Sequence, residues 1–77
     1  MMFNKYRVIT FTKNMKDGET TFKEEFNTEK EAMTRFYFNC NSYGSNPETK
    51  ACEVIVFNSK GDIIKFEKID NTQYITE

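Results

Sequence analysis

Residues 28–43, TEKEAMTRFYFNCNSY, are predicted to form the one helix of this chain, with two strands before it and two after it. Thr28 and Glu31 match a capping box, in which the Thr28 hydroxyl accepts a hydrogen bond from the Glu31 amide and the Glu31 carboxylate accepts one from the Thr28 amide. Gly44 is expected to end the helix in the left-handed conformation, which glycine adopts at little cost. The predicted helix therefore covers residues 29–43.

The apolar side chains of this helix fall mainly within one arc of roughly 140°, at about 100° per residue. The arc contains Ala32, Met33, Phe36, Tyr37, Cys40 and Tyr43. Phe38 lies nearly opposite, beside Arg35, where a polar residue is expected. Two interpretations stay open: a loop or the C-terminal tail covers Phe38, or Phe38 belongs to a contact surface on the side away from the open sheet face.

Four runs rich in β-branched and aromatic residues are predicted to form strands. They are expected at about residues 5–13, 19–26, 50–58 and 62–69. One helix can cover one face of a four-stranded antiparallel sheet, so the order β-β-α-β-β predicts a two-layer α+β fold, with residues 1–77 as a single domain. The strand order 2-1-3-4 makes all neighbours antiparallel and places the third strand, which is the most apolar, inside the sheet.

The first hairpin has two registers that exchange the faces of its strands, because successive side chains of a strand point to opposite sides. One register places Ile9 and Phe11 beside Phe22 and Phe26 on the buried face. The other places Tyr6 and Val8 there. The first is favoured because it buries more apolar area, and the second stays open.

The second hairpin is predicted to turn through Asn58-Ser59-Lys60-Gly61, with Gly61 in the left-handed region. This turn sets three expected pairs on the helix side: Val56 with Ile64, Val54 with Phe66, and Cys52 with Lys68. The expected open face then carries Ala51, Glu53, Ile55, Phe57, Ile63, Lys65, Glu67 and Ile69.

The composition disfavours several classes of function. Eleven Lys and Arg residues against twelve Asp and Glu residues give a net charge of −1, unlike a strongly basic nucleic-acid binder or an acidic mimic of DNA. The chain has no histidine, which removes the commonest general base and a principal zinc ligand. No apolar run is long enough for a signal peptide or a membrane span, so a soluble, cytoplasmic protein is expected.

The candidate chemical groups do not form a recognisable active site. Glu53 and Glu67 are expected to be cross-strand neighbours on the open face, where two close carboxylates can share acid and base roles. Lys65, diagonal to Glu53, is expected to screen them on a solvated surface. Cys40 and Cys52 are expected to be reduced core residues that can lie close together, with a disulfide possible but not favoured. No enzyme activity, cofactor or metal is therefore predicted.

The predicted function is protein binding, including self-association as a homodimer. An exposed apolar patch on the open sheet face is typical of an interface, although scattered exposed apolar residues are also normal on monomers. The candidate protein-binding residues are Phe38, Arg35, Ile55, Phe57, Ile63 and Lys65. The alternative is single-stranded nucleic-acid binding, in which Phe57 stacks on bases among lysines, although Glu53 and Glu67 weaken that field.

The capped run FNTEKEA at residues 26–32 and the hairpin VFNSKGDIIK at residues 56–65 resemble small uncharacterised proteins encoded by phages and mobile elements of low-GC Gram-positive bacteria. The Lys-, Asn-, Ile- and Phe-rich composition is similar to theirs. The resemblance implies no active site. It implies a context in which small phage proteins bind a host or phage protein, sometimes a defence component such as a CRISPR effector, so an anti-defence role follows by analogy.

Overall fold

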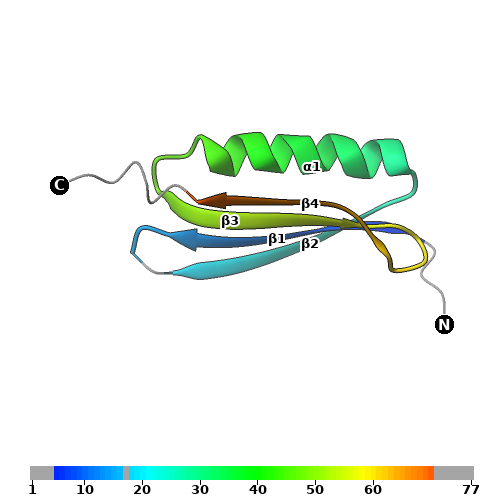
Figure 1. Cartoon of the computed structure of the whole chain (residues 1–77), viewed down its shortest axis with the longest axis horizontal. Helices are drawn as coiled ribbons and strands as arrows, with labels where there is room; N and C mark the ends of the chain where they lie inside the picture. The colour runs from blue at the N-terminus through cyan, green and yellow to red at the C-terminus, as the bar shows by residue number, and fades with distance from the viewer. Residues whose placement is uncertain (1–4, 17, 71–77) are drawn as a thin grey trace.

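The computed structural model describes residues 5–16 and 18–70, which form four strands and one helix (Figure 1). In chain order these are β1 (Tyr6–Asn14), β2 (Glu19–Phe26), α1 (Glu29–Gly44), β3 (Thr49–Phe57) and β4 (Ile63–Asp70). Each begins and ends within one residue of the predicted bounds. The predicted order β-β-α-β-β is confirmed.

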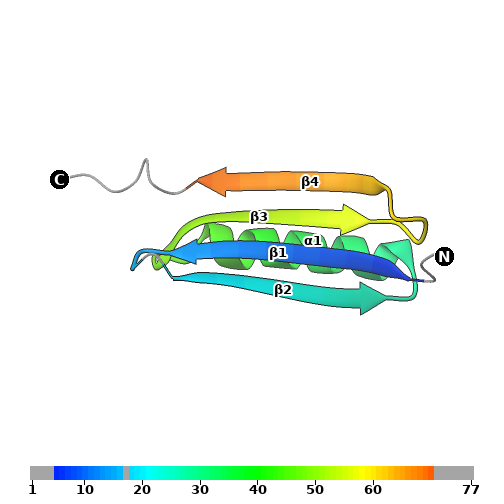
Figure 2. The same ribbon diagram turned by 90° about the horizontal axis from the view of Figure 1, so that it is seen from below.

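The strands form one antiparallel sheet in the order β2-β1-β3-β4, as predicted. The helix lies across one face of this sheet, and the opposite face carries no second layer of described residues (Figure 1). Seen through the sheet, α1 lies behind β1 and β3, whereas β4 lies to one side of it (Figure 2). The domain is therefore a two-layer α+β fold with one covered and one open sheet face.

The two ends of α1 differ in how well the sequence predicted them. Thr28 is extended (φ −130°, ψ 156°), and its Oγ1 accepts a hydrogen bond from the Glu31 amide at 3.2 Å, so the predicted N-cap is confirmed. The prediction of a left-handed Gly44 is wrong. Gly44 is the last helical residue, and Ser45 follows with φ −99°, its amide donating to the Asn41 carbonyl at 3.1 Å.

Gly44 has a packing role in place of the predicted conformational one. A Cβ on Gly44 would lie 3.3 Å from Cδ1 of Ile69 in β4. That distance is shorter than an ordinary van der Waals contact, so the Ile69 side chain would have to move by a few tenths of an ångström to make room for a larger residue.

The buried line of α1 runs through Ala32, Phe36 and Asn39, of which Asn39 was not predicted to be inside. Tyr37, which was predicted to face inward, is 56% exposed. At 100° per residue, Tyr37 lies at one edge of the predicted apolar arc and Asn39 lies just beyond the other edge. The helix is therefore rotated about its axis so that Asn39 faces the sheet and Tyr37 faces solvent. The core cluster consists of Val8, Ala32, Phe36, Cys52, Val54 and Val56.

The favoured register of the first hairpin is wrong, and the alternative is the one observed. Tyr6 pairs with Phe26, Val8 with Glu24, and Thr10 with Phe22. Val8 and Thr10 are completely buried, so this set of side chains faces α1. The amount of buried apolar area did not decide between the two registers. The helix packs closely on β1 through Val8 and through Thr10, whose hydroxyl accepts a hydrogen bond from Asn39.

The predicted pairs of the second hairpin are also wrong by one residue. Val56 pairs with Lys65, Val54 with Glu67, and Cys52 with Ile69. The register shifts at the start of β4, where Phe57 pairs with Ile63 and Ile64 is the additional residue of a bulge. As predicted, Gly61 is left-handed (φ 92°).

The loop itself matches the predicted turn. The Asn58 amide donates to the Asp62 carbonyl at 2.8 Å, and Asn58 Oδ1 accepts from the amides of Lys60 and Asp62 at 2.8 and 2.9 Å. Phe57 pairs with Ile63, as this turn requires, so the register changes only at Ile64, and from Lys65 onward the bulge moves each β4 side chain to the other face.

Candidate functional site

The open face is defined by the alternate residues of each strand that point away from α1. These are Arg7, Ile9, Phe11 and Lys13 of β1, Glu19, Thr21, Lys23 and Glu25 of β2, Ala51, Glu53, Ile55 and Phe57 of β3, and Ile63, Phe66, Lys68 and Asp70 of β4. The cross-strand pairs join them in continuous rows across the sheet. The face is thus one surface, built from all four strands.

The centre of the open face is apolar. Ile9 pairs with Ile55, and Ile55 pairs with Phe66, which makes an apolar row across β1, β3 and β4. Phe11 and Phe57 lie on either side of this row, two residues along their strands from Ile9 and Ile55. Phe11 is 42% exposed and Phe66 is 50% exposed, so a large part of this apolar area meets solvent. Contiguous area of this kind is typical of an interaction surface.

The charges of the open face surround this centre and balance one another. The four bases are Arg7, Lys13, Lys23 and Lys68, and the four acids are Glu19, Glu25, Glu53 and Asp70. Arg7 Nε lies 3.6 Å from Glu25 Oε2, and Glu53 pairs across the strands with Lys68. A polar rim around an apolar centre is the usual anatomy of a protein interface.

A shallow hollow of about 300 Å³ adjoins the apolar centre near the β1–β2 turn. Its lining includes Phe11 and Ala51 together with Glu53 and Lys68. A hollow beside an exposed apolar row can receive a protruding side chain of a partner.

The structure groups some of the predicted site residues and separates others. Ile55 and Phe57 lie half-buried on the open face, and Ile63, 60% exposed, pairs with Phe57 there. Lys65 was placed on this face, which is wrong: it pairs with the buried Val56 and therefore lies on the helix side.

Three apolar residues of the open face were missed, namely Ile9, Phe11 and Phe66. Both parities of β1 are rich in apolar and β-branched residues, so its sequence carries no clear signal of which one faces the helix. Phe66 was missed because the bulge at Ile64 was not foreseen.

The candidate carboxylate pair does not exist as predicted. Glu53 is on the open face opposite Lys68, whereas Glu67 pairs with Val54 on the helix side. The two carboxylates therefore lie on opposite faces of the sheet, and the shared acid–base chemistry considered for them has no geometric basis.

Phe38 lines a groove between α1 and β2. It is 57% exposed, and the Arg35 guanidinium carbon lies 5.1 Å from the centre of its ring. Both residues line two hollows of about 500 Å³ each, one continuing past Phe22 and Tyr43 and the other past Phe26. Phe38 is thus covered in part by a cation–π contact with its neighbour. The C-terminal tail, the other predicted cover, lies outside the described residues.

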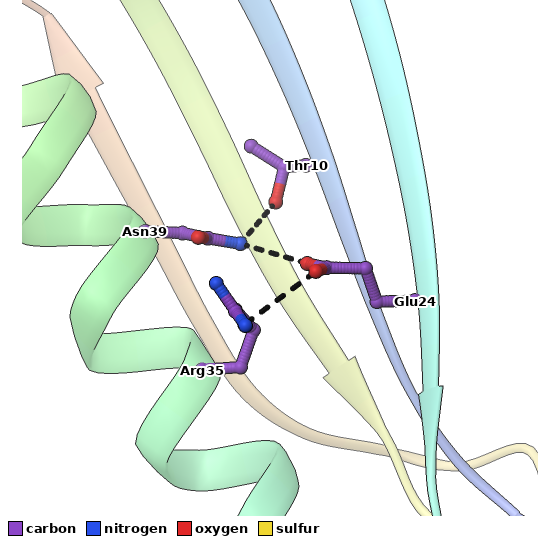
Figure 3. Close-up of polar contacts among 4 residues, drawn as sticks. All are labelled: Thr10, Glu24, Arg35 and Asn39. Atoms are coloured by element: carbon purple, nitrogen blue, oxygen red, sulfur yellow. Dashed lines mark hydrogen bonds and ion pairs between the residues drawn. The ribbon is translucent and has the colours of Figure 1, made fainter.

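A polar network at the floor of this groove ties α1 to β1 and β2 (Figure 3). Asn39 Nδ2 donates to Thr10 Oγ1 at 3.1 Å and to Glu24 Oε1 at 3.3 Å. Arg35 Nε lies 3.4 Å from Glu24 Oε2. Because Asn39 and Thr10 are buried, these bonds replace the water that both side chains would otherwise bind.

The two cysteines are free thiols, as expected. Burial is the main cause that raises the pKa of the Cys40 thiol to about 11, and Cys52 and Glu67 add to the increase while Lys65 opposes it. Burial also raises the pKa of Cys52, with Glu53 and Glu67 contributing. Both thiols are therefore protonated near neutral pH and are poor nucleophiles.

Alkylation of Cys40 at pH 8 is expected to be about a hundredfold slower than that of a thiol with the reference pKa of 9.0, because the thiolate is the reacting form. Between pH 8 and 10 the rate should keep rising about tenfold per pH unit. Peptide mapping after timed iodoacetamide treatment measures this, with the urea-unfolded chain as control. A rate that levels off near pH 9 in the folded protein would contradict the raised pKa.

Among residues 5–16 and 18–70, no group of three Cys, Asp or Glu side chains lies close enough together to hold a metal ion. Within the same residues, no helix combines the length and the apolar character needed to cross a membrane. Comparison of the chain with family models, with curated proteins and with solved structures gives no match.

Proposed function

We propose that this protein is a small, non-enzymatic protein-binding module whose open sheet face binds another protein. The observation that carries this proposal is the continuous apolar row of Ile9, Ile55 and Phe66, flanked by Phe11 and Phe57 and only partly shielded from water. Removing such a surface from water on binding is favourable in proportion to the apolar area that is buried.

The balanced charges of the open face indicate the chemistry of the partner. Four bases and four acids surround the apolar centre, so the face has no net attraction for a strongly acidic or strongly basic molecule. A partner surface with an apolar centre and few formal charges fits it best.

The setting we propose is the cytoplasm of a bacterial host, where a phage or mobile-element protein would bind and modulate a host or defence protein. The free Cys40 and Cys52 fit a reducing compartment. The resemblance of the helix cap and the second hairpin to small phage proteins supports the setting.

The open face is tested by replacing Phe11 and Ile55 with threonine, a β-branched residue that strands favour. The partner captured by the wild-type chain from a lysate of its own host is purified and titrated by calorimetry. The double variant is expected to raise the dissociation constant about a hundredfold or more, because two central apolar contacts are lost. Tyr37→Ser, which removes an exposed aromatic of α1, should bind like the wild type.

Equal affinity of the wild type and the Phe11→Thr, Ile55→Thr double variant would contradict the proposal. The proposal would also be contradicted if the double variant retained every protein that the wild-type chain retains. Far-ultraviolet circular dichroism of each variant checks that the fold is intact.

The three phenylalanines on one sheet face, Phe11, Phe57 and Phe66, favour a second candidate function, the stacking of single-stranded nucleic-acid bases. The balanced charges argue against it, because phosphate binding needs a basic surface. Fluorescence anisotropy with mixed-sequence DNA and RNA oligonucleotides over a salt series decides the matter. Absence of binding at the lowest salt concentration rules this candidate out.

A further inference from the structure

The strand β4 is an uncovered edge of the sheet. It is the last strand in the order β2-β1-β3-β4, and every residue from Ile63 to Asp70 except Ile69 is exposed. No described element lies beyond it (Figure 2). The outer edge of such a strand presents backbone N–H and C=O groups that can pair with another strand.

The two edges of the sheet differ in charge. The residues of β2 include three glutamates and one lysine, whereas β4 carries two lysines, one glutamate and one aspartate. Pairing two copies of β2 would therefore bring together two strands that each carry a net negative charge. Each copy of β4 has no net charge, so pairing two copies of β4 carries no such repulsion. Like charges directly opposite each other destabilise a strand pair.

The order of residues in β4 is complementary to itself in the register centred on Phe66, which pairs the strand over most of its length. When two copies of a strand pair antiparallel about a twofold axis, one residue faces its own copy, and residues at equal distances on either side face each other. With Phe66 on the axis, Lys65 of each copy faces Glu67 of the other. Centring on Lys65 or on Glu67 would place two lysines or two glutamates face to face.

The surroundings of β4 leave room for this pairing. Lys65 and Glu67 are exposed on the helix side, and within the described residues neither forms an ion pair. The helix lies over β1 and β3 and does not extend over β4 (Figure 2). On the other side of the strand, Lys68 is already opposite Glu53 of its own chain.

From this edge we propose that the protein forms a homodimer in which β4 pairs antiparallel with β4 of a second copy, centred on Phe66. The two sheets join into one of eight strands, and their open faces lie side by side. The inference does not rest on the proposed function, because it concerns the strand edge and the pair Lys65–Glu67 rather than binding by the open face.

A charge exchange tests the register. K65E alone and E67K alone each place like charges opposite each other twice per dimer, so each should raise the dimer dissociation constant about tenfold or more in sedimentation equilibrium. The double variant K65E/E67K restores opposite charges and should recover the wild-type constant. K60E carries the same change of net charge in the loop before β4 and should dimerise like the wild type.

Cross-linking tests the same register directly. Phe66→Cys places two thiols face to face at a Cα separation that a disulfide can span, so mild oxidation should give a covalent dimer. In Ile64→Cys the two thiols would lie four residues apart along the strands, about 13 Å, and no such dimer should form.

A wild-type chain that stays monomeric at millimolar concentration overturns the inference. So does a double variant that dimerises no better than the single variants, or a disulfide that forms from Ile64→Cys and not from Phe66→Cys. The proposed function fails separately, because none of the charge variants alters the open face and the Phe11→Thr, Ile55→Thr variant leaves the edge residues intact.

Discussion

Replacing Phe36 with alanine is expected to destabilise the fold by about 3–5 kcal/mol, the usual cost of deleting a buried aromatic ring. Phe36 is 2% exposed and lies in the core cluster with Val8, Val54 and Val56. A domain of this size is expected to have a total stability near the lower end of about 5–15 kcal/mol. The variant should therefore be largely unfolded at moderate temperature, as measured by urea unfolding followed by circular dichroism.

The next two aromatics of α1 provide matched controls. Tyr37 and Phe38 are 56% and 57% exposed, so Tyr37→Ala and Phe38→Ala should each cost less than about 1 kcal/mol. Phe38→Ala also removes the contact with Arg35, whose cation–π energy at an exposed site is about 0.5–1 kcal/mol. Similar losses for all three variants would contradict the observed rotation of the helix.

The second large effect is expected at Asn39. Asn39→Ala removes the amide that donates to Thr10 and Glu24 and leaves the buried Thr10 hydroxyl without this donor. An unsatisfied buried polar group costs about 1–3 kcal/mol, which urea unfolding at pH 7 can resolve.

A double-mutant cycle with Thr10→Val separates this hydrogen bond from simple loss of packing. Thr10→Val removes the hydroxyl while it keeps a β-branched side chain in the same space. The double variant should be less destabilised than the sum of the two single variants, because the second change removes the group that the first left unpaired. Strictly additive losses would show that the Asn39–Thr10 bond contributes nothing.

The elements of this fold were predictable because their signals are local. Thr28 and Glu31 are three residues apart, and the left-handed Gly61 follows from a turn pattern within four residues. The strand order followed from requiring antiparallel neighbours and an inner place for the most apolar strand, β3.

The faces of the strands were harder to predict, because a shift of one residue reverses them. In β4 the shift comes from the bulge at Ile64, which no apolar pattern reveals. In β1 it depends on Asn39, an amide from α1 that makes Thr10 a suitable core residue. As a result, Ile55 and Phe57 of the open face were predicted, while Ile9, Phe11 and Phe66 were not.

The isoleucine methyl groups offer the most direct test of binding by the open face. Ile9 and Ile55 lie at its centre, whereas Ile69 pairs with Cys52 on the helix side and serves as an internal control. In a methyl NMR titration with the captured partner, the Ile9 and Ile55 signals should shift or broaden while that of Ile69 stays in place. A partner that shifts Ile69 and leaves Ile9 and Ile55 unchanged would contradict binding at the open face.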